Sequence, residues 1–139
     1  MNILNCRCGD RVADVAPLIL RVVTGLVFLM HGWQKVGMGV AGVTGFLGSL
    51  GFPAPEVMAV LLIAVEVGGG LLLILGAFTH WVSKVLAFVA LVALLTVHLS
   101  KGFFVSGGGY EFALLLLAAC IALALTGPGK WSVDRAWRK

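Results

Sequence analysis

Four long runs of apolar residues, at about 16–36, 55–79, 81–100 and 109–127, make up most of the chain. Each run is close to the roughly 20 residues that a helix needs to cross a hydrocarbon core of about 30 Å. Inside lipid every backbone N–H and C=O must be paired within the protein, and these runs lack the alternation of barrel strands. The pattern therefore predicts an all-α integral membrane protein, an antiparallel four-transmembrane-helix bundle over residues 15–128.

The segment between the first two runs has a pattern of its own. Glycine recurs there at short intervals, at Gly37, Gly39, Gly42, Gly45, Gly48 and Gly51. Apolar residues lie between these glycines, and Pro53 closes the segment. This predicts a short interfacial helix between spans one and two. Pro17 is expected in the opening turn of the first span, where a helix tolerates proline.

The composition excludes a soluble domain. Hydrophobic residues make up 60% of the chain and charged residues 12%, and the mean hydropathy is +1.08. Soluble domains carry about 25% charged residues. The net charge of +4 is dispersed, without the basic stripe that nucleic-acid binding requires, so the predicted surroundings are a lipid bilayer and no nucleic acid.

Basic residues predict the orientation. Seven fall in the polar arm (residues 1–14), at the start of span three and in the basic tail (residues 129–139): Arg7, Arg11, Lys84, Lys130, Arg135, Arg138 and Lys139. The opposite side carries Lys35 and Lys101. The positive-inside rule then places both termini in the cytoplasm.

This topology brings polar residues from all four spans to the outer side: His31, Gln34, Lys35, Glu56, His98, Lys101, Tyr110 and Glu111. Ordinary helix-end charges that reach for water are the preferred explanation for Lys35, Glu56 and Lys101 taken singly. For His98 with Tyr110 and Glu111, which a glycine-rich turn joins, a binding site and this helix-end explanation are equally open.

Two charges lie deeper, Arg21 in the first span and Glu66 near the middle of the second. A lone ion at that depth costs at least about 2.5–3.5 kcal/mol on insertion scales, so each should face the bundle interior and find a partner. We predict an Arg21–Glu66 pair, or a protonated Glu66 if Arg21 turns toward the headgroups. A structural clamp and a proton relay both remain open, with the clamp preferred.

The histidines and cysteines raise the question of a haem or a metal site. His31 and His98 lie at similar depth on different spans, which keeps a bis-histidine b-type haem as a minority possibility. Cys6 and Cys8 do not complete a zinc site, so no metal is predicted. Cys120 is expected to be a small packing residue.

The chain resembles the DoxX family of small four-helix membrane proteins over about residues 17–134. The resemblance is carried by Arg21, by residues 31–35 (His-Gly-Trp-Gln-Lys) and 50–56 (Leu-Gly-Phe-Pro-Ala-Pro-Glu), by Glu66 before Gly68-Gly69, by His98, and by residues 101–104, 108–111 and 126–129. The family is similar to the small membrane subunits of thiosulfate:quinone oxidoreductase, and its members are associated with quinone, thiol and oxidative-stress systems. It is also distantly similar to a eukaryotic endoplasmic-reticulum cargo receptor, which is not an enzyme.

Two functions from different classes follow. In the first, a protein of the bacterial cytoplasmic (inner) membrane binds a quinone, alone or as a subunit beside a soluble oxidoreductase partner. His98 and Glu111 would exchange protons and Glu66 with Arg21 would extend the proton path. Ligand contacts would come from His31, Gln34, Lys35, Lys101 and Tyr110. The alternative is a non-catalytic membrane carrier, lipid-binding or partner-docking protein, and the glycine content is compatible with a homo-oligomer.

Overall fold

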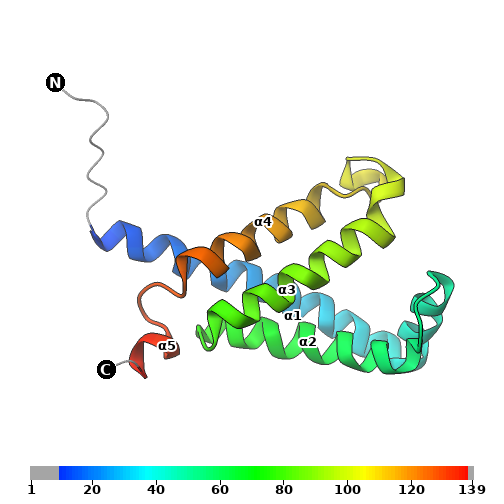
Figure 1. Ribbon diagram of the computed structural model, residues 1–139, viewed down its shortest axis with the longest axis horizontal. Coiled ribbons are helices and arrows are strands. Elements are labelled where there is room, and N and C mark those ends of the chain that lie inside the picture. The colour runs from blue at the N-terminus through cyan, green and yellow to red at the C-terminus, as the bar shows by residue number, and fades with distance from the viewer. Residues whose placement is uncertain (1–9, 138–139) are drawn as a thin grey trace.

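The computed structural model describes residues 10–137, with side chains from residue 15 onward, and the described part is helical throughout (Figure 1). The helices are α1 (Asp10–Ser49), α2 (Pro55–Leu75), α3 (Thr79–Ala93), α4 (Glu111–Thr126) and the short α5 (Val133–Ala136). A π-turn, η1 (Leu94–His98), and a 3-10 turn, η2 (Leu99–Lys101), extend α3, and η3 (Val105–Gly107) lies in the loop before α4. The prediction of an all-α protein is confirmed. Cys6 and Cys8 lie outside the described residues.

Three helical segments are long and apolar enough to cross a membrane: Val15–Ser49, Pro55–Leu75 and Thr79–Lys101. These segments fit a helical membrane protein. The fourth, α4, is apolar but has 16 residues. At 1.5 Å per residue it is about 24 Å long, shorter than a typical hydrocarbon core, so its crossing stays a prediction.

Helix α1 continues well beyond the first predicted span. Its backbone leaves helical geometry at Gly39, where φ is 73° and ψ 159°, so α1 is two helices joined at a kink. The second helix, residues 40–49, corresponds to the short helix predicted from the glycine pattern. Pro17 lies in the interior because α1 begins at Asp10, so the expectation that Pro17 opens the helix is wrong, and one backbone hydrogen bond is lost there.

Glycines set the register between α1 and α2. A Cβ atom on Gly25 would lie 2.7 Å from the Gly70 carbonyl oxygen, and one on Gly32 would lie 2.9 Å from the Val67 nitrogen. Only the absence of side chains allows the two backbones to approach so closely, as is usual at helix interfaces in membranes. This register places Arg21 opposite the end of α2 rather than opposite its middle.

Arg21 therefore does not pair with Glu66, and the predicted ion pair is wrong. Its guanidinium is 1% exposed and donates to four backbone carbonyls: Leu73 (3.1 Å), Ile74, Pro128 (3.1 Å) and Trp131 (2.5 Å). Leu73 and Ile74 end α2, where a cation also meets the negative end of the helix dipole. Arg21 therefore lies at the level of Ile74 in α2. That level is about eight residues, or roughly 12 Å along the helix axis, from Glu66.

Two more side chains tie the helices at this end, which we call the tail end (residues 76–79 and 127–137). The Asp134 carboxylate accepts from the backbone N–H groups of Phe78 (2.7 Å) and Thr79 (2.8 Å), and so caps the start of α3. His80 Nδ1 lies 2.7 Å from the Ala124 carbonyl oxygen. That carbonyl has no helical donor, because residue 128 is proline. The described part of the basic tail is thus folded across the turn between α2 and α3.

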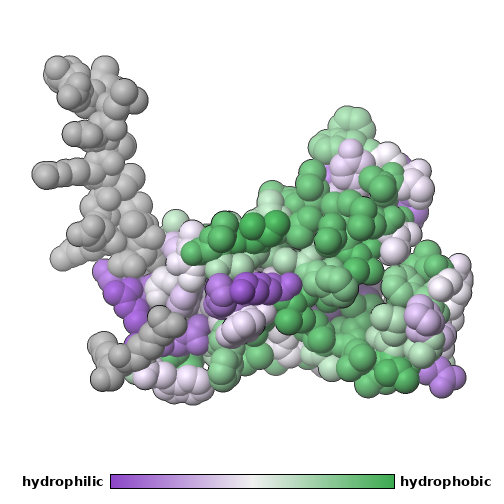
Figure 2. All heavy atoms as spheres, in the orientation of Figure 1, coloured by the Kyte–Doolittle hydropathy of each residue, from purple (hydrophilic) through white to green (hydrophobic). Residues whose placement is uncertain are grey.

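The opposite end, which we call the loop end (residues 37–54 and 99–110), is open. Figure 1 shows the α3–α4 hairpin diverging there from α1 and α2. The main core lies nearer the tail end and contains Phe28, Leu73, Leu86, Ala90, Cys120 and Leu123, so Cys120 is a packing residue as expected. On the face shown in Figure 2, hydrophobic side chains cover most of the surface between the two ends, which fits a lipid-facing protein.

Replacing Arg21 tests the tail-end clamp. Arg21→Gln removes the charge and takes the Arg21 donors from the carbonyls of Ile74, Pro128 and Trp131, so we expect a loss of about 3 kcal/mol, or roughly 10 °C in Tm in detergent. The matched control is Lys84→Gln, which removes an exposed cation that lies 4.7 Å from the Trp81 ring centroid. Thermal unfolding by size-exclusion chromatography measures both. Equal Tm values for the two variants would contradict the clamp.

Candidate functional site

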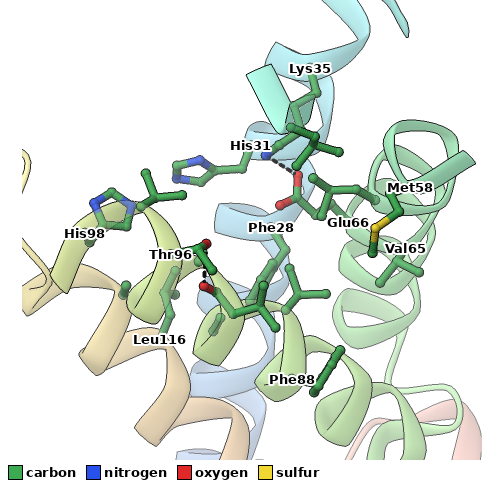
Figure 3. A pocket seen from close by; sticks show the side chains of 18 of the residues that line it. Phe28, His31, Lys35, Met58, Val65, Glu66, Phe88, Thr96, His98 and Leu116 are labelled. Atoms are coloured by element: carbon green, nitrogen blue, oxygen red, sulfur yellow. Dashed lines mark hydrogen bonds and ion pairs between the residues drawn. The ribbon is translucent and has the colours of Figure 1, made fainter. Parts of the chain in front are cut away.

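A cavity of about 510 Å³ lies between the α1–α2 and α3–α4 hairpins, toward the loop end (Figure 3). All four long helices contribute to its wall. Five polar side chains line it: His31, Lys35, Glu66, Thr96 and His98. Every other lining residue is apolar, including Phe28, Val65, Phe88 and Leu116. Its volume and its apolar wall with a few convergent polar groups are typical of a small-molecule site.

An ion pair dominates the polar end of the cavity. Lys35 Nζ lies 2.6 Å from Glu66 Oε2, and the two side chains are 20% and 7% exposed. The same glycine register that separates Arg21 from Glu66 brings Lys35, one turn beyond Gly32, to the carboxylate. Removing either partner would leave a buried charge without its counter-ion, which is strongly destabilising.

His31 of α1 lies beside this pair, and His98, on η1, lies beyond His31 (Figure 3). His98 Nδ1 is 2.7 Å from the Gly108 carbonyl oxygen. If Nδ1 donates that bond, Nε2 is left as an acceptor toward the cavity. His31 stacks at a tilt against Phe112, with ring centroids 6.1 Å apart. Two imidazoles on one cavity wall fit the donor set of a b-type haem, but the neighbouring Lys35–Glu66 pair puts charge where a macrocycle would need an apolar surface.

The π-turn η1 positions the α3 side of the site. It spans Leu94–His98, and Thr96, Val97 and His98 all line the cavity. A π-turn inserts an extra residue into a helix and rotates the side chains that follow, and such turns are frequent at functional sites. Thr96 donates its hydroxyl to the Val92 carbonyl at 2.7 Å. Thr96 was not identified as a site residue from the sequence. A polar residue two positions before His98, within an apolar run, could have indicated it.

The other predicted site residues lie elsewhere. Glu111 accepts from the Val105 N–H at 2.6 Å, and the Tyr110 ring packs edge-on against Phe103 with centroids 5.4 Å apart. Gly109 is required in this turn, because a Cβ atom there would collide with the Gly102 carbonyl. Lys101 lies along Gly108, and its side chain and that of Gln34 are exposed. Arg21 is at the tail end. None of these five residues, Arg21, Gln34, Lys101, Tyr110 or Glu111, lines the cavity.

Comparison with known proteins identifies the family. The DoxX family profile matches residues 16–99, which is more than half of the chain. The chain belongs to the DoxX family. It is similar to a Bacillus subtilis protein named "Putative oxidoreductase CatD", with 40% identity over 87% of this chain and 86% of that protein. It is also similar to the Escherichia coli inner membrane proteins YqjF (32% identity; 93% of this chain, 97% of that protein) and YphA (32%; 97% and 99%).

No solved structure matches the chain. The DoxX match runs from α1 to η1 and contains His31, Lys35, Glu66 and His98, the four ionisable side chains of the cavity. It ends before the turn that holds Lys101, Tyr110 and Glu111. Within the part of the chain that the structure describes, no group of three or more His, Cys, Asp or Glu side chains could hold a metal ion.

A double-mutant cycle tests the ion pair. Lys35→Met leaves the Glu66 carboxylate without its counter-ion, and we expect this single change to cost about 3 kcal/mol of stability. Adding Glu66→Gln removes the stranded carboxylate, so the double variant should recover most of that loss. Thermal unfolding of the four proteins in one detergent measures the coupling. Strictly additive losses would show that Lys35 and Glu66 do not interact.

Proposed function

We propose that this DoxX-family protein binds a quinone, or a similarly shaped amphipathic molecule, in the cavity between its two hairpins. The observation that carries the proposal is the convergence of Lys35, Glu66, His31 and His98 at one end of an otherwise apolar cavity. A quinone has the matching shape, because its polar ring oxygens are attached to an apolar tail. In this proposal all four long helices cross the cytoplasmic membrane of a bacterium, with both termini in the cytoplasm.

Three of the five polar side chains have specific roles in this proposal. Lys35 donates to a ring oxygen, and His98, whose Nδ1 is held by the Gly108 carbonyl, presents Nε2 to the second. Glu66 takes or returns a proton while Lys35 compensates its charge. A bound quinone supplies two-electron chemistry that also consumes or releases two protons. Glu111, Tyr110 and Arg21 have structural roles instead: they hold the loop before α4 and the tail end.

The electrons would come from a partner protein. Cys120, the one cysteine in the described part of the chain, is buried in the core and does not reach the cavity. The relative named "Putative oxidoreductase CatD" supports a redox context, and the names of YqjF and YphA support the inner membrane. We therefore place this protein as a membrane subunit or accessory that binds the quinone and moves protons beside a separate oxidoreductase.

A second candidate is a lipid carrier without redox chemistry. The observation in its favour is that Lys35 and Glu66 already neutralise each other, so the cavity needs no reacting ligand to be stable. A phospholipid or fatty acyl chain fits an apolar cavity of this size as well as a quinone tail does. The two candidates differ in whether quinone binds in preference to bulk phospholipid.

A binding titration tests the proposed function. The full-length protein in nanodiscs is titrated with a short-chain ubiquinone analogue, and binding is followed by tryptophan fluorescence and by calorimetry. We expect saturable one-to-one binding, weakened at least about tenfold by His98→Ala or Glu66→Gln, since each removes a hydrogen bond worth about 1.5 kcal/mol or more.

The matched controls are Lys101→Ala and Glu111→Gln, which change polar residues near the loop end but outside the cavity. Both should bind within about twofold of the unchanged protein. Quinone that fails to compete with phospholipid, or that binds equally well to the His98 and control variants, would favour the lipid carrier. Haem bands in the absorption spectrum of the purified protein would instead favour the bis-histidine alternative.

A further inference from the structure

The cavity extends far beyond its polar end. Its lining runs along α3 from His98 back to Val85, a distance of about 20 Å at 1.5 Å per residue. Along α2, which runs antiparallel to α3, it extends from Glu66 toward the loop end as far as Met58. Figure 3 shows Phe88 far from His31, Lys35 and His98, at the opposite end of the cavity. A head group bound at the ion pair would leave this apolar extension empty.

The extension opens sideways between α2 and α3. Leu61, Val85 and Phe88 line the cavity and are nevertheless 57%, 48% and 67% exposed. In a membrane protein, side chains exposed midway along the helices face hydrocarbon. These residues therefore stand at the rim of a lateral opening rather than deep in a closed pocket.

The opposite side of the cavity, between α1 and α4, carries a polar group. There His31 stacks against Phe112, both of them exposed, while Phe28 and Ala113 beneath them are 3% and 7% exposed. For a ligand whose head group occupies the polar end, the side of the cavity between α2 and α3 is therefore the apolar path to the bilayer. Within this path, side chains on both helices are aliphatic or aromatic, and they offer no hydrogen bonds to water or to a polar ligand.

We propose that the α2–α3 opening is a slot for the hydrocarbon chain of the ligand, and that the ligand enters from the bilayer through it. This inference rests on the proposed function and specifies its substrate class: a molecule with a chain long enough to run from the Lys35–Glu66 pair past Phe88, not a water-soluble ring. The chain lies along the slot with its end in the surrounding lipid. The hydrocarbon chain of the ligand fills the space that the two diverging hairpins leave between them.

Filling the slot tests the proposal. Leu61→Trp and Val85→Trp place a large side chain in the opening at positions that are already exposed, so both variants keep the core intact. The matched control is Leu91→Trp, on α3, 38% exposed and outside the cavity lining. Two probes, a decyl-benzoquinone and the same ring without its chain, are titrated into nanodiscs, with affinities expressed per mole of lipid to remove the effect of partitioning.

We expect both slot variants to weaken decyl-benzoquinone binding about tenfold while the chainless ring is affected less than about twofold. Leu91→Trp should change neither affinity. If both probes bind the unchanged protein and neither slot variant discriminates between them, the slot is overturned while the proposed function stands. If neither probe binds the unchanged protein, the proposed function fails and the slot with it.

Photo-crosslinking gives a result that does not depend on the folding of any variant. A quinone with a diazirine in the middle of its chain is activated on the unchanged protein, and the labelled peptides are mapped by mass spectrometry. Labels concentrated around Leu61 and Phe88 support the slot. Labels spread evenly over the lipid-facing surfaces of all four helices overturn it.

Discussion

The buried Arg21 guanidinium is the interaction on which the rest of the structure depends. A cation at this depth is costly unless the protein satisfies it, and four backbone carbonyls from two separate segments do so. Those carbonyls belong to the end of α2 and to the chain after α4, so one side chain of α1 joins three parts of the fold. Asp134 and His80 extend the network to α3. All four long helices are therefore tied together at the tail end.

No comparable network joins the hairpins at the loop end of the described chain. There the side-chain bonds stay within one hairpin: Lys35–Glu66 joins α1 to α2, and His98–Gly108 joins α3 to the loop before α4. Apolar contact alone gives little reason for helices to associate in lipid, since lipid tails are equally apolar. The hairpins accordingly diverge from a fixed end, and the space between them becomes a cavity whose polar end holds the ion pair. The attachment of the hairpins at the tail end alone thus explains both the shape of the fold and the presence of the proposed binding cavity.

Sequence reasoning recovered the helical architecture because hydropathy reports directly on lipid exposure, and it found His31, Lys35, Glu66 and His98 because ionisable residues are rare in apolar runs. It paired Arg21 with Glu66 wrongly, since the register of α1 against α2 depends on close contacts at Gly25, Gly32 and Gly70 that composition does not reveal. The π-turn before His98 has no sequence signature. Tyr110 and Glu111 stand near His98 along the chain, but the loop turns them away from the cavity.

Native mass spectrometry of the protein released from its own membranes tests the central claim most directly. The account predicts a stoichiometric chain-bearing quinone retained by the unchanged protein and lost from Lys35→Met/Glu66→Gln, whose polar end is neutral while its fold is kept. Identical adducts on both proteins, or phospholipid alone on each, would contradict the claim that the ion pair between the hairpins is the head-group site.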